Sequence, residues 1–138
     1  MSMKVLIADP DWRFSTQATR YLESHAHLVV QQTQTEQISE AVCNWRPDLV
    51  IVSEELTEAG LLESIQAAPE RPAVLLVGWM DRYDRVWRAW QRGGDELMMK
   101  PIFQSRPHTN TCLMYCVTRE TRRRALHRTP PASRQHVH

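Results

Sequence analysis

The sequence contains few of the features that mark secreted or membrane-spanning chains. It has three cysteines, an odd number with no CxxC pair, so we expect free thiols rather than a disulfide framework. No run approaches the roughly 18 apolar residues of a membrane span, and the N-terminal stretch MSMKVLIADPD has too short an apolar core for a signal peptide. These absences predict a cytoplasmic protein that does not enter a membrane.

The sequence also lacks the short motifs that most directly indicate an enzyme or a nucleic-acid reader. We find no Gly-rich phosphate loop, no GxSxG elbow and no His-rich site, so a reading as an enzyme or a flavin-binding protein rests on the fold alone. Helix-turn-helix and zinc-finger patterns are missing as well, and nucleic acid is therefore not an expected partner. No cofactor follows from these residues.

What is present is an ordinary globular composition with an uneven distribution of charge. The chain has 138 residues, of which 42% are hydrophobic and 24% are charged, and this fits one domain. Residues 1–103 carry 10 Lys and Arg against 15 Asp and Glu, whereas residues 104–138 carry 7 Arg against Glu120 alone. We predict a folded domain over residues 1–127 and a basic, disordered tail over residues 128–138. The basic stretch before the tail is read as a solvated helix end, with an acidic protein or nucleic acid as the alternative.

Short apolar runs alternate along the chain with segments of helical periodicity. Asp11 can cap a helix that places Phe14, Ala18 and Leu22 on one face. Strands that are apolar throughout, each followed by a helix, are typical of a parallel sheet covered on both faces, so we predict a doubly wound α/β fold. The predicted strands are 5–8, 28–30, 49–52, 73–77 and 97–99, and the predicted helices are about 11–24, 35–45, 58–67, 81–91 and 108–127. In the last of these helices, Cys112 and Cys116 suit core packing better than a metal site.

Four stretches of this pattern resemble the successive signature blocks of bacterial response-regulator receiver domains. They are MKVLIADPDW, RPDLVIVSEEL, AVLLVG and GGDELMMKPIF, and the resemblance covers roughly residues 3–125. It implies a five-stranded flavodoxin-like sheet with strand order 2-1-3-4-5. It also implies a site at the carboxyl ends of the strands, where an aspartate accepts a phosphoryl group from a histidine kinase. In that chemistry an acidic pair holds Mg²⁺, a Ser or Thr ends the fourth strand, and a lysine ends the fifth.

The match to this site is partial when it is carried over residue by residue. Asp9 and Lys100 stand where the first acid and the lysine belong. Pro10 replaces the second acid, Ser53 replaces the phosphoacceptor aspartate, and Val77 replaces the hydroxyl residue of the fourth strand. A serine hydroxyl is neutral at pH 7 and needs a general base, which the sequence does not offer in an obvious place. We therefore predict a degenerate receiver that acts by protein–protein interaction.

Several interpretations of the site residues stay open at this stage. Lys100 either bridges to Asp9 and holds the site together, which we favour, or takes part in phosphoryl chemistry. The DPD sequence is either the end of a strand followed by a helix cap or the remains of a metal site, in which Asp9 and Asp11 would bind Mg²⁺. The second interpretation corresponds to an atypical phosphorelay receiver that still responds to phosphoryl donors. Glu54 and Glu55 do not replace the lost aspartate, because at least one of them should point away from Asp9.

A second group of residues suggests an interaction surface. Trp87 and Trp90 cannot both be central to the face of their helix that meets the sheet, and arginines such as Arg88 are interleaved with them. Leu97 stands where receiver domains usually have a switching aromatic residue. Aromatic and Arg side chains concentrate binding energy at interfaces, so these residues predict contact with a signalling partner, either a histidine kinase or an output protein, or a homodimer. The expected surface is made by the predicted helix 81–91, the strand 97–99 and the last helix, which is the face through which receiver domains commonly dimerise or meet partners. Ordinary core packing with arginine stems at the edges is the alternative.

Overall fold

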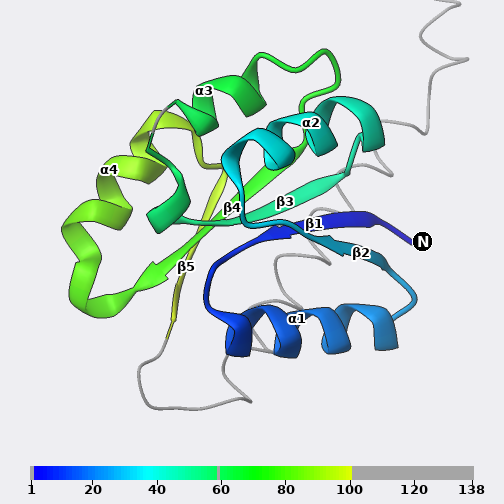
Figure 1. Cartoon of the computed structure of the whole chain (residues 1–138). Helices are drawn as coiled ribbons and strands as arrows, with labels where there is room; N and C mark the ends of the chain where they lie inside the picture. Colours follow the sequence, from blue (N-terminus) through cyan, green and yellow to red (C-terminus); the bar gives the residue numbers. More distant parts are fainter. Residues whose placement is uncertain (1, 59, 101–138) are drawn as a thin grey trace, which may run out of the picture.

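The computed structural model describes residues 2–58 and 60–100 and confirms the alternation of strands and helices (Figure 1). The strands are β1 (Lys4–Ala8), β2 (Leu28–Gln31), β3 (Leu49–Ser53), β4 (Ala73–Trp79) and β5 (Glu96–Lys100). The helices are α1 (Trp12–Ser24), α2 (Thr35–Trp45), α3 (Leu61–Gln66) and α4 (Tyr83–Gly93). The predicted last helix with its two cysteines, and the predicted tail over residues 128–138, lie outside the described residues.

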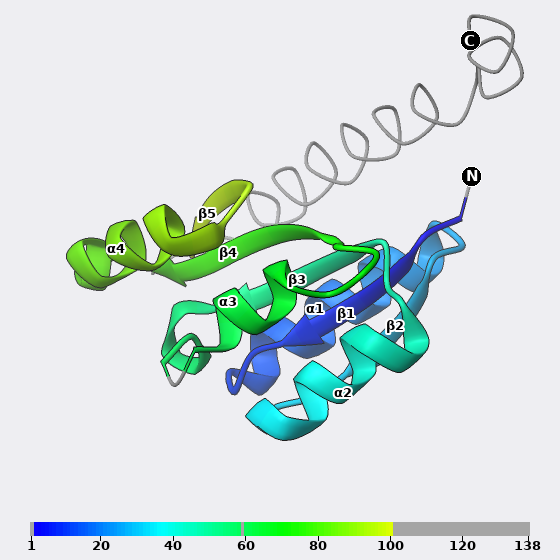
Figure 2. The same ribbon diagram turned by 90° about the horizontal axis from the view of Figure 1, so that it is seen from above.

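All strand pairs are parallel, and the sheet order β2-β1-β3-β4-β5 confirms the predicted fold class. Helix α1 lies on one face of the sheet, and α2, α3 and α4 lie on the other (Figure 1). Seen from above, α4 is at the end of this row, beside β4 and β5 (Figure 2). Burial on both faces explains why β1, β3 and β4 are almost entirely apolar. The edge strand β2 is more exposed, and Leu28 retains 58% of its accessible surface.

The sheet separates two apolar layers, each made of residues that alternate along the strands. The layer on the α1 side includes Phe14, Ala18 and Leu22, as the helical spacing predicted. The layer on the opposite side is built on residues of β1, β3 and β4 and is covered by α2, α3 and α4. Its buried members are Leu6, Ala8, Ile38, Val42, Val50, Val52, Leu61, Leu62, Ile65, Val74, Leu76, Val86 and Ala89. In the described part of the chain, no helix is long and apolar enough to cross a bilayer.

The boundaries differ from the prediction around α3 and α4. A 3₁₀ turn, Glu54–Leu56, follows β3 directly, and α3 begins only after Gly60, whose φ of 76° is a left-handed conformation that favours glycine. The predicted helix over residues 58–67 is therefore shorter. Strand β4 extends two residues beyond the predicted end, and a second 3₁₀ turn, Met80–Arg82, leads into α4. These short turns have no apolar periodicity by which the sequence could reveal them.

Gly78 allows α4 to pack unusually close to β4. A Cβ atom at this position would collide with the side chain of Val86, which is fully buried on α4. The residue before the glycine, Val77, faces the α1 side, where it is also fully buried. The end of β4 is therefore shaped by packing on both sides.

Candidate functional site

The site lies at the carboxyl edge of the sheet and is centred on an ion pair between the ends of β1 and β5. Asp9 follows β1 directly, Lys100 is the last residue of β5, and both are buried. The Nζ atom of Lys100 lies 2.7 Å from Oδ2 of Asp9, so the predicted bridge between these residues is present. The other carboxylate oxygen of Asp9 accepts a hydrogen bond from the backbone N–H of Asp11 at 2.8 Å. The Asp9 side chain is thus engaged on both oxygens.

Asp11 contributes to the same cluster while it also begins α1. Its Oδ1 accepts hydrogen bonds from the backbone N–H groups of Arg13 and Phe14, at 3.1 and 3.5 Å, which is the predicted helix cap. Its Oδ2 lies 3.3 Å from the Nζ atom of Lys100. One ammonium therefore contacts two carboxylates, and each carboxylate is also fixed by backbone N–H groups. Pro10 is exposed between them.

Two aromatic rings complete the surroundings of Lys100. Its Nζ atom lies 4.9 Å from the ring centre of Phe14 and 4.8 Å from that of Trp79. Such cation–π contacts strengthen when the cation is removed from water, as it is here. The residue pattern predicted a core position for Phe14 and a fourth strand that ends before Trp79. The parallel register pairs Trp79 with Lys100, so a longer predicted strand would have revealed this contact.

The residue at the phosphoacceptor position has a local structural role. Ser53 ends β3, is 2% exposed, and accepts a hydrogen bond on Oγ from the backbone N–H of Glu55 at 3.2 Å. It thereby caps the 3₁₀ turn that follows. In the sheet it pairs with Val77, whose apolar side chain packs beneath α1. Neither position supplies a carboxylate to the strand ends.

The two glutamates after Ser53 interact with the 3₁₀ turn that precedes α4, and not with Asp9 or Lys100. Arg82, which precedes α4, has its Nη1 atom 3.0 Å from Oε2 of Glu55 and 3.8 Å from Oε2 of Glu54. Burial raises the pKa of Glu54 above its ordinary value of 4.5, and the charge of Arg82 opposes that rise. The expectation that these glutamates do not replace the missing aspartate agrees with this geometry.

Burial also raises the pKa of Asp9 above its ordinary value of 3.8. The Lys100 ammonium lowers it again by charge attraction and hydrogen bonding, the backbone N–H of Asp11 lowers it further, and the Asp11 carboxylate raises it. The rise prevails because desolvation is the largest of these effects. The ion pair with Lys100 therefore offsets part of the cost of burying the charged carboxylate of Asp9.

The donor set is poorly suited to Mg²⁺, which requires near-octahedral oxygen ligands at about 2.0–2.1 Å. Asp9 and Asp11 each direct one carboxylate oxygen to the same point, and the Lys100 ammonium occupies that point. Ser53 offers a neutral hydroxyl in place of a third carboxylate. Within residues 2–58 and 60–100, no three His, Cys, Asp or Glu side chains are grouped so that they could hold a metal ion.

The predicted interaction residues lie apart from this cluster. Trp87 is 40% exposed on α4, whereas Trp90 is partly buried and packs against the apolar layer on that side of the sheet. Arg88 is exposed on the same helix, and Leu97 of β5 is partly buried beside the same layer as Trp90. This confirms the prediction that Trp87 and Trp90 are not both central to the core.

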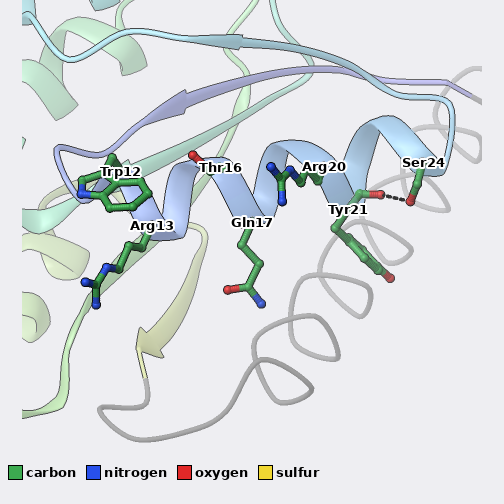
Figure 3. Close-up of a pocket in the computed structure, with 7 residues that line it drawn as sticks. All are labelled: Trp12, Arg13, Thr16, Gln17, Arg20, Tyr21 and Ser24. Carbon is green, nitrogen blue, oxygen red and sulfur yellow. Dashed lines mark hydrogen bonds between the residues drawn. The ribbon is translucent and has the colours of Figure 1, made fainter.

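A pocket along α1 is separate from the strand-end cluster (Figure 3). Among the residues that the structure describes, its lining includes two arginines and no carboxylate, and these residues approach the cluster at the start of the helix, next to Asp11. The side chains of Gln17 and Tyr21 project from one side of the helix, and the Ser24 hydroxyl donates a hydrogen bond to the Tyr21 carbonyl. The lining residues are Trp12, Arg13, Thr16, Gln17, Arg20, Tyr21 and Ser24.

Comparison with known proteins supports the fold. No protein-family model and no curated protein matches the sequence. Among solved structures, the signal receiver domain of the response regulator NarL from Mycobacterium tuberculosis is similar with a TM-score of 0.68 and 19% identity, over 85% of this chain and 97% of that one. A response regulator from Chloroflexus aurantiacus is similar with a TM-score of 0.73 and 18% identity, over 87% of this chain and 98% of that one.

A longer protein shows the same likeness in one part of its chain. NtrX from Brucella abortus, solved in complex with ADP, is similar with a TM-score of 0.75 and 15% identity. The similarity covers 94% of this chain but only 29% of the NtrX chain. The described residues therefore have the fold of response-regulator receiver domains, and at these identities the likeness concerns the fold alone.

Proposed function

We propose that this protein is a receiver-like module of two-component signal transduction that acts by binding other proteins, without a phosphoryl switch at the strand ends and without a bound Mg²⁺. The observation that carries this proposal is the buried Lys100 ammonium, which is held by Asp9, Asp11 and two aromatic rings. In a phosphorylatable receiver, the metal and the lysine would both be needed to neutralise the developing phosphoryl charge. Here the lysine is the cation around which both acids are arranged.

The chemistry available at Ser53 also supports this proposal. A serine becomes a nucleophile when a neighbouring base removes its proton. The hydroxyl of Ser53 instead accepts a hydrogen bond from the backbone and caps a turn. Glu54 and Glu55, the nearest acids in sequence, are within ion-pair distance of Arg82. Ser53 is therefore better suited to ending β3 than to receiving a phosphoryl group.

An atypical phosphorelay receiver is the second candidate. It is favoured by one observation, which is that Asp9 and Asp11 converge on a single cation. If Mg²⁺ displaced the Lys100 ammonium, the two carboxylates could serve as ligands, and a residue other than Ser53 would have to accept the phosphoryl group. This alternative requires the buried ion pair to break, which is costly in the absence of a replacement.

Incubation of the full chain with Mg²⁺ and acetyl phosphate, followed by intact-mass spectrometry, distinguishes the two candidates. The proposal predicts no added phosphoryl group under conditions that label a phosphorylatable receiver domain in parallel. A Mg²⁺-dependent adduct that is lost in the Asp9→Asn variant would contradict it and support the atypical receiver. Labelling that persists without Mg²⁺ and in Asp9→Asn would indicate modification outside the strand-end site and leave the proposal standing.

A further inference from the structure

The surroundings of the Lys100 ammonium have the composition of a binding site for an organic cation. Two carboxylate oxygens lie within ion-pair distance of its Nζ atom, Oδ2 of Asp9 at 2.7 Å and Oδ2 of Asp11 at 3.3 Å. The ring centres of Phe14 and Trp79 lie 4.9 and 4.8 Å from the same atom. Proteins use aromatic faces of this kind to bind ammonium ligands such as choline and methylated lysine. The four residues Asp9, Asp11, Phe14 and Trp79 are here called the ammonium cage.

Both rings of the ammonium cage are positioned by the fold and not by the cation. Phe14 belongs to the buried face of α1 and packs in the apolar layer on that side of the sheet. Trp79 is the last residue of β4, and the parallel register pairs it with Lys100 on β5. Paired residues on adjacent strands direct their side chains to the same face of the sheet. We therefore expect the rings to remain in place when the ammonium is removed.

The two carboxylates of the cage need one monovalent cation between them. Oδ2 of Asp9 is buried, and within residues 2–58 and 60–100 the Lys100 ammonium is the one group at ion-pair distance from it. Asp11 differs, because its Oδ1 binds the first backbone N–H groups of α1, and the positive end of that helix offsets part of its charge. A cage without a cation would leave the Asp9 carboxylate buried and unpaired, which is costly. An emptied cage therefore has a driving force to take up a cation.

The same cage discriminates against a small divalent cation. Mg²⁺ loses its water reluctantly, and it usually keeps several waters beside one or two carboxylates. Part of the space around the cation is taken here by the rings of Phe14 and Trp79, which supply no oxygen ligand and displace the water that Mg²⁺ retains. An alkylammonium gains from these rings instead, because cation–π attraction strengthens when the cation is desolvated. The rings thus favour one class of cation over the other.

We propose that the strand-end site is a binding site for an organic ammonium group, with Lys100 as its resident ligand, and that Phe14 and Trp79 set its preference for an ammonium over Mg²⁺. The inference rests on the proposed function, in which no Mg²⁺ is bound. It adds the class of cation that the site accepts and the two residues that select this class. Because the site is filled by a side chain of the same chain, it accepts a free amine only when that side chain is removed.

The test replaces the lysine side chain by a free amine in the full chain. Lys100→Ala removes Cγ, Cδ, Cε and Nζ, and n-propylammonium supplies the same atoms. This variant is titrated with n-propylammonium at constant ionic strength, and the Trp79 indole N–H signal in NMR and the midpoint of urea denaturation are measured. We expect a saturable shift of the signal and a higher midpoint. Equal concentrations of 1-propanol, the neutral match, or of Mg²⁺ should produce neither, and the unchanged protein should not respond to n-propylammonium.

Matched ring variants assign the preference to the cage. In the Lys100→Ala background, Trp79→Leu should weaken n-propylammonium binding about tenfold or more, as expected for a desolvated cation–π contact. Trp12→Leu is the control, because Trp12 is 69% exposed and its ring lies against Arg13 rather than Lys100. The control should bind n-propylammonium as tightly as the Lys100→Ala variant does.

A second measurement keeps the inference testable if Lys100→Ala does not fold without the amine. A double-mutant cycle combines Trp79→Leu with Lys100→Met, which retains a side chain of similar length without the charge. Trp79→Leu should lower the folding equilibrium constant about tenfold more when the lysine is present than in the Lys100→Met background. An equal effect in both backgrounds would mean that the ring contributes packing alone, and it would overturn the inference.

Two further results would overturn the inference. One is binding of Mg²⁺ to Lys100→Ala that is at least as tight as binding of n-propylammonium, and the other is a response to n-propylammonium no larger than that to 1-propanol. Both are independent of the acetyl phosphate experiment, which uses the unchanged protein. A phosphorylated protein whose Lys100→Ala variant prefers the amine would contradict the proposed function alone. An unphosphorylated protein whose Lys100→Ala variant does not respond to the amine would contradict only the ammonium site.

Discussion

The strand-end cluster and the outer face of α4, where the rings of Tyr83, Trp87 and Trp90 form a row, use similar side chains in different surroundings. In the cluster, a lysine ammonium lies between two aromatic rings and two carboxylates, and it is 4% exposed. On α4, the rings of Tyr83 and Trp87 stack at the surface, and Arg85 and Arg88 of the same helix are exposed. Buried cations and rings bind each other and stabilise one arrangement, whereas the same groups in water remain available to a partner. This contrast supports the proposed function, in which the domain acts by binding and not by a phosphoryl switch.

The largest expected effect comes from breaking the buried ion pair. Lys100→Met leaves the carboxylate of Asp9 buried without its main counter-ion, so we expect a loss of about 3–5 kcal/mol in the free energy of unfolding at neutral pH. The double variant Asp9→Asn, Lys100→Met removes both charges and should recover most of this loss. Urea denaturation measures both. A loss below about 1 kcal/mol for Lys100→Met would show that the pair behaves like a surface salt bridge.

The close contact between β4 and α4 connects the two regions and gives the next effect in size. Gly78→Ala places a methyl group against Val86, so we expect a loss of about 1–3 kcal/mol together with displacement of α4. Because Val86→Ala makes room for that methyl group, the two changes combined should cost less than the sum of their separate losses. Strictly additive losses in a double-mutant cycle would mean that the two residues do not restrict each other.

A smaller effect concerns the pH dependence of stability. The pKa of Glu54 is raised in the folded protein, so the folded state binds more protons than the unfolded state between the ordinary value of 4.5 and the raised value. The stability that Glu54 contributes is therefore greatest below 4.5 and is lost as pH rises through its folded pKa. Relative to Glu54→Gln, the unchanged protein should become more stable as pH falls from 7 towards 4.5. Denaturation curves across this range that shift in the opposite direction would contradict the burial argument.

The smallest expected effect on stability comes from a change on the outer face of α4. Trp87 is 40% exposed, and its ring contacts only those of Tyr83 and Trp90 among the aromatic pairs of α4. Trp87→Ala should therefore lower the free energy of unfolding by about 0.5–1.5 kcal/mol. Thermal and urea denaturation of this variant, compared with Lys100→Met, measure the contrast between the two regions directly. A loss of about 2 kcal/mol or more would instead place Trp87 among the core residues and return it to the packing interpretation.

The sequence predicted the framework because the fold depends on patterns that neighbouring residues share. Apolar strands such as Leu49–Ser53 and the helical spacing of Phe14, Ala18 and Leu22 are repeated local signals, and they gave the order of the elements correctly. Resemblance to receiver domains supplied the strand order. The two 3₁₀ turns were not predicted, because a segment of three residues is too short to show a periodic pattern of apolar residues.

The site was only partly predictable because it is made of residues that are distant in sequence. The pairing of Asp9 with Lys100 followed from the strand ends and is confirmed. The two rings around the ammonium were missed because the side of the sheet that Trp79 faces depends on how far β4 extends. The attachment of Glu55 to Arg82 depends on a tertiary contact between two turns, which the residue pattern does not encode.

The most direct measurement of the central claim is a titration of the full chain with Mg²⁺ and beryllofluoride, a mimic of an aspartyl phosphate, followed by backbone amide NMR. Trp12, which follows Asp11 at the start of α1, and Trp79, whose ring contacts Lys100, provide indole signals near the site. The account predicts that the amides of Asp9, Ser53 and Lys100 and these two indoles do not shift when both ions are present. Shifts at these positions that require both ions and extend to α4 would contradict it, since they would show that the strand ends still respond to a phosphoryl signal.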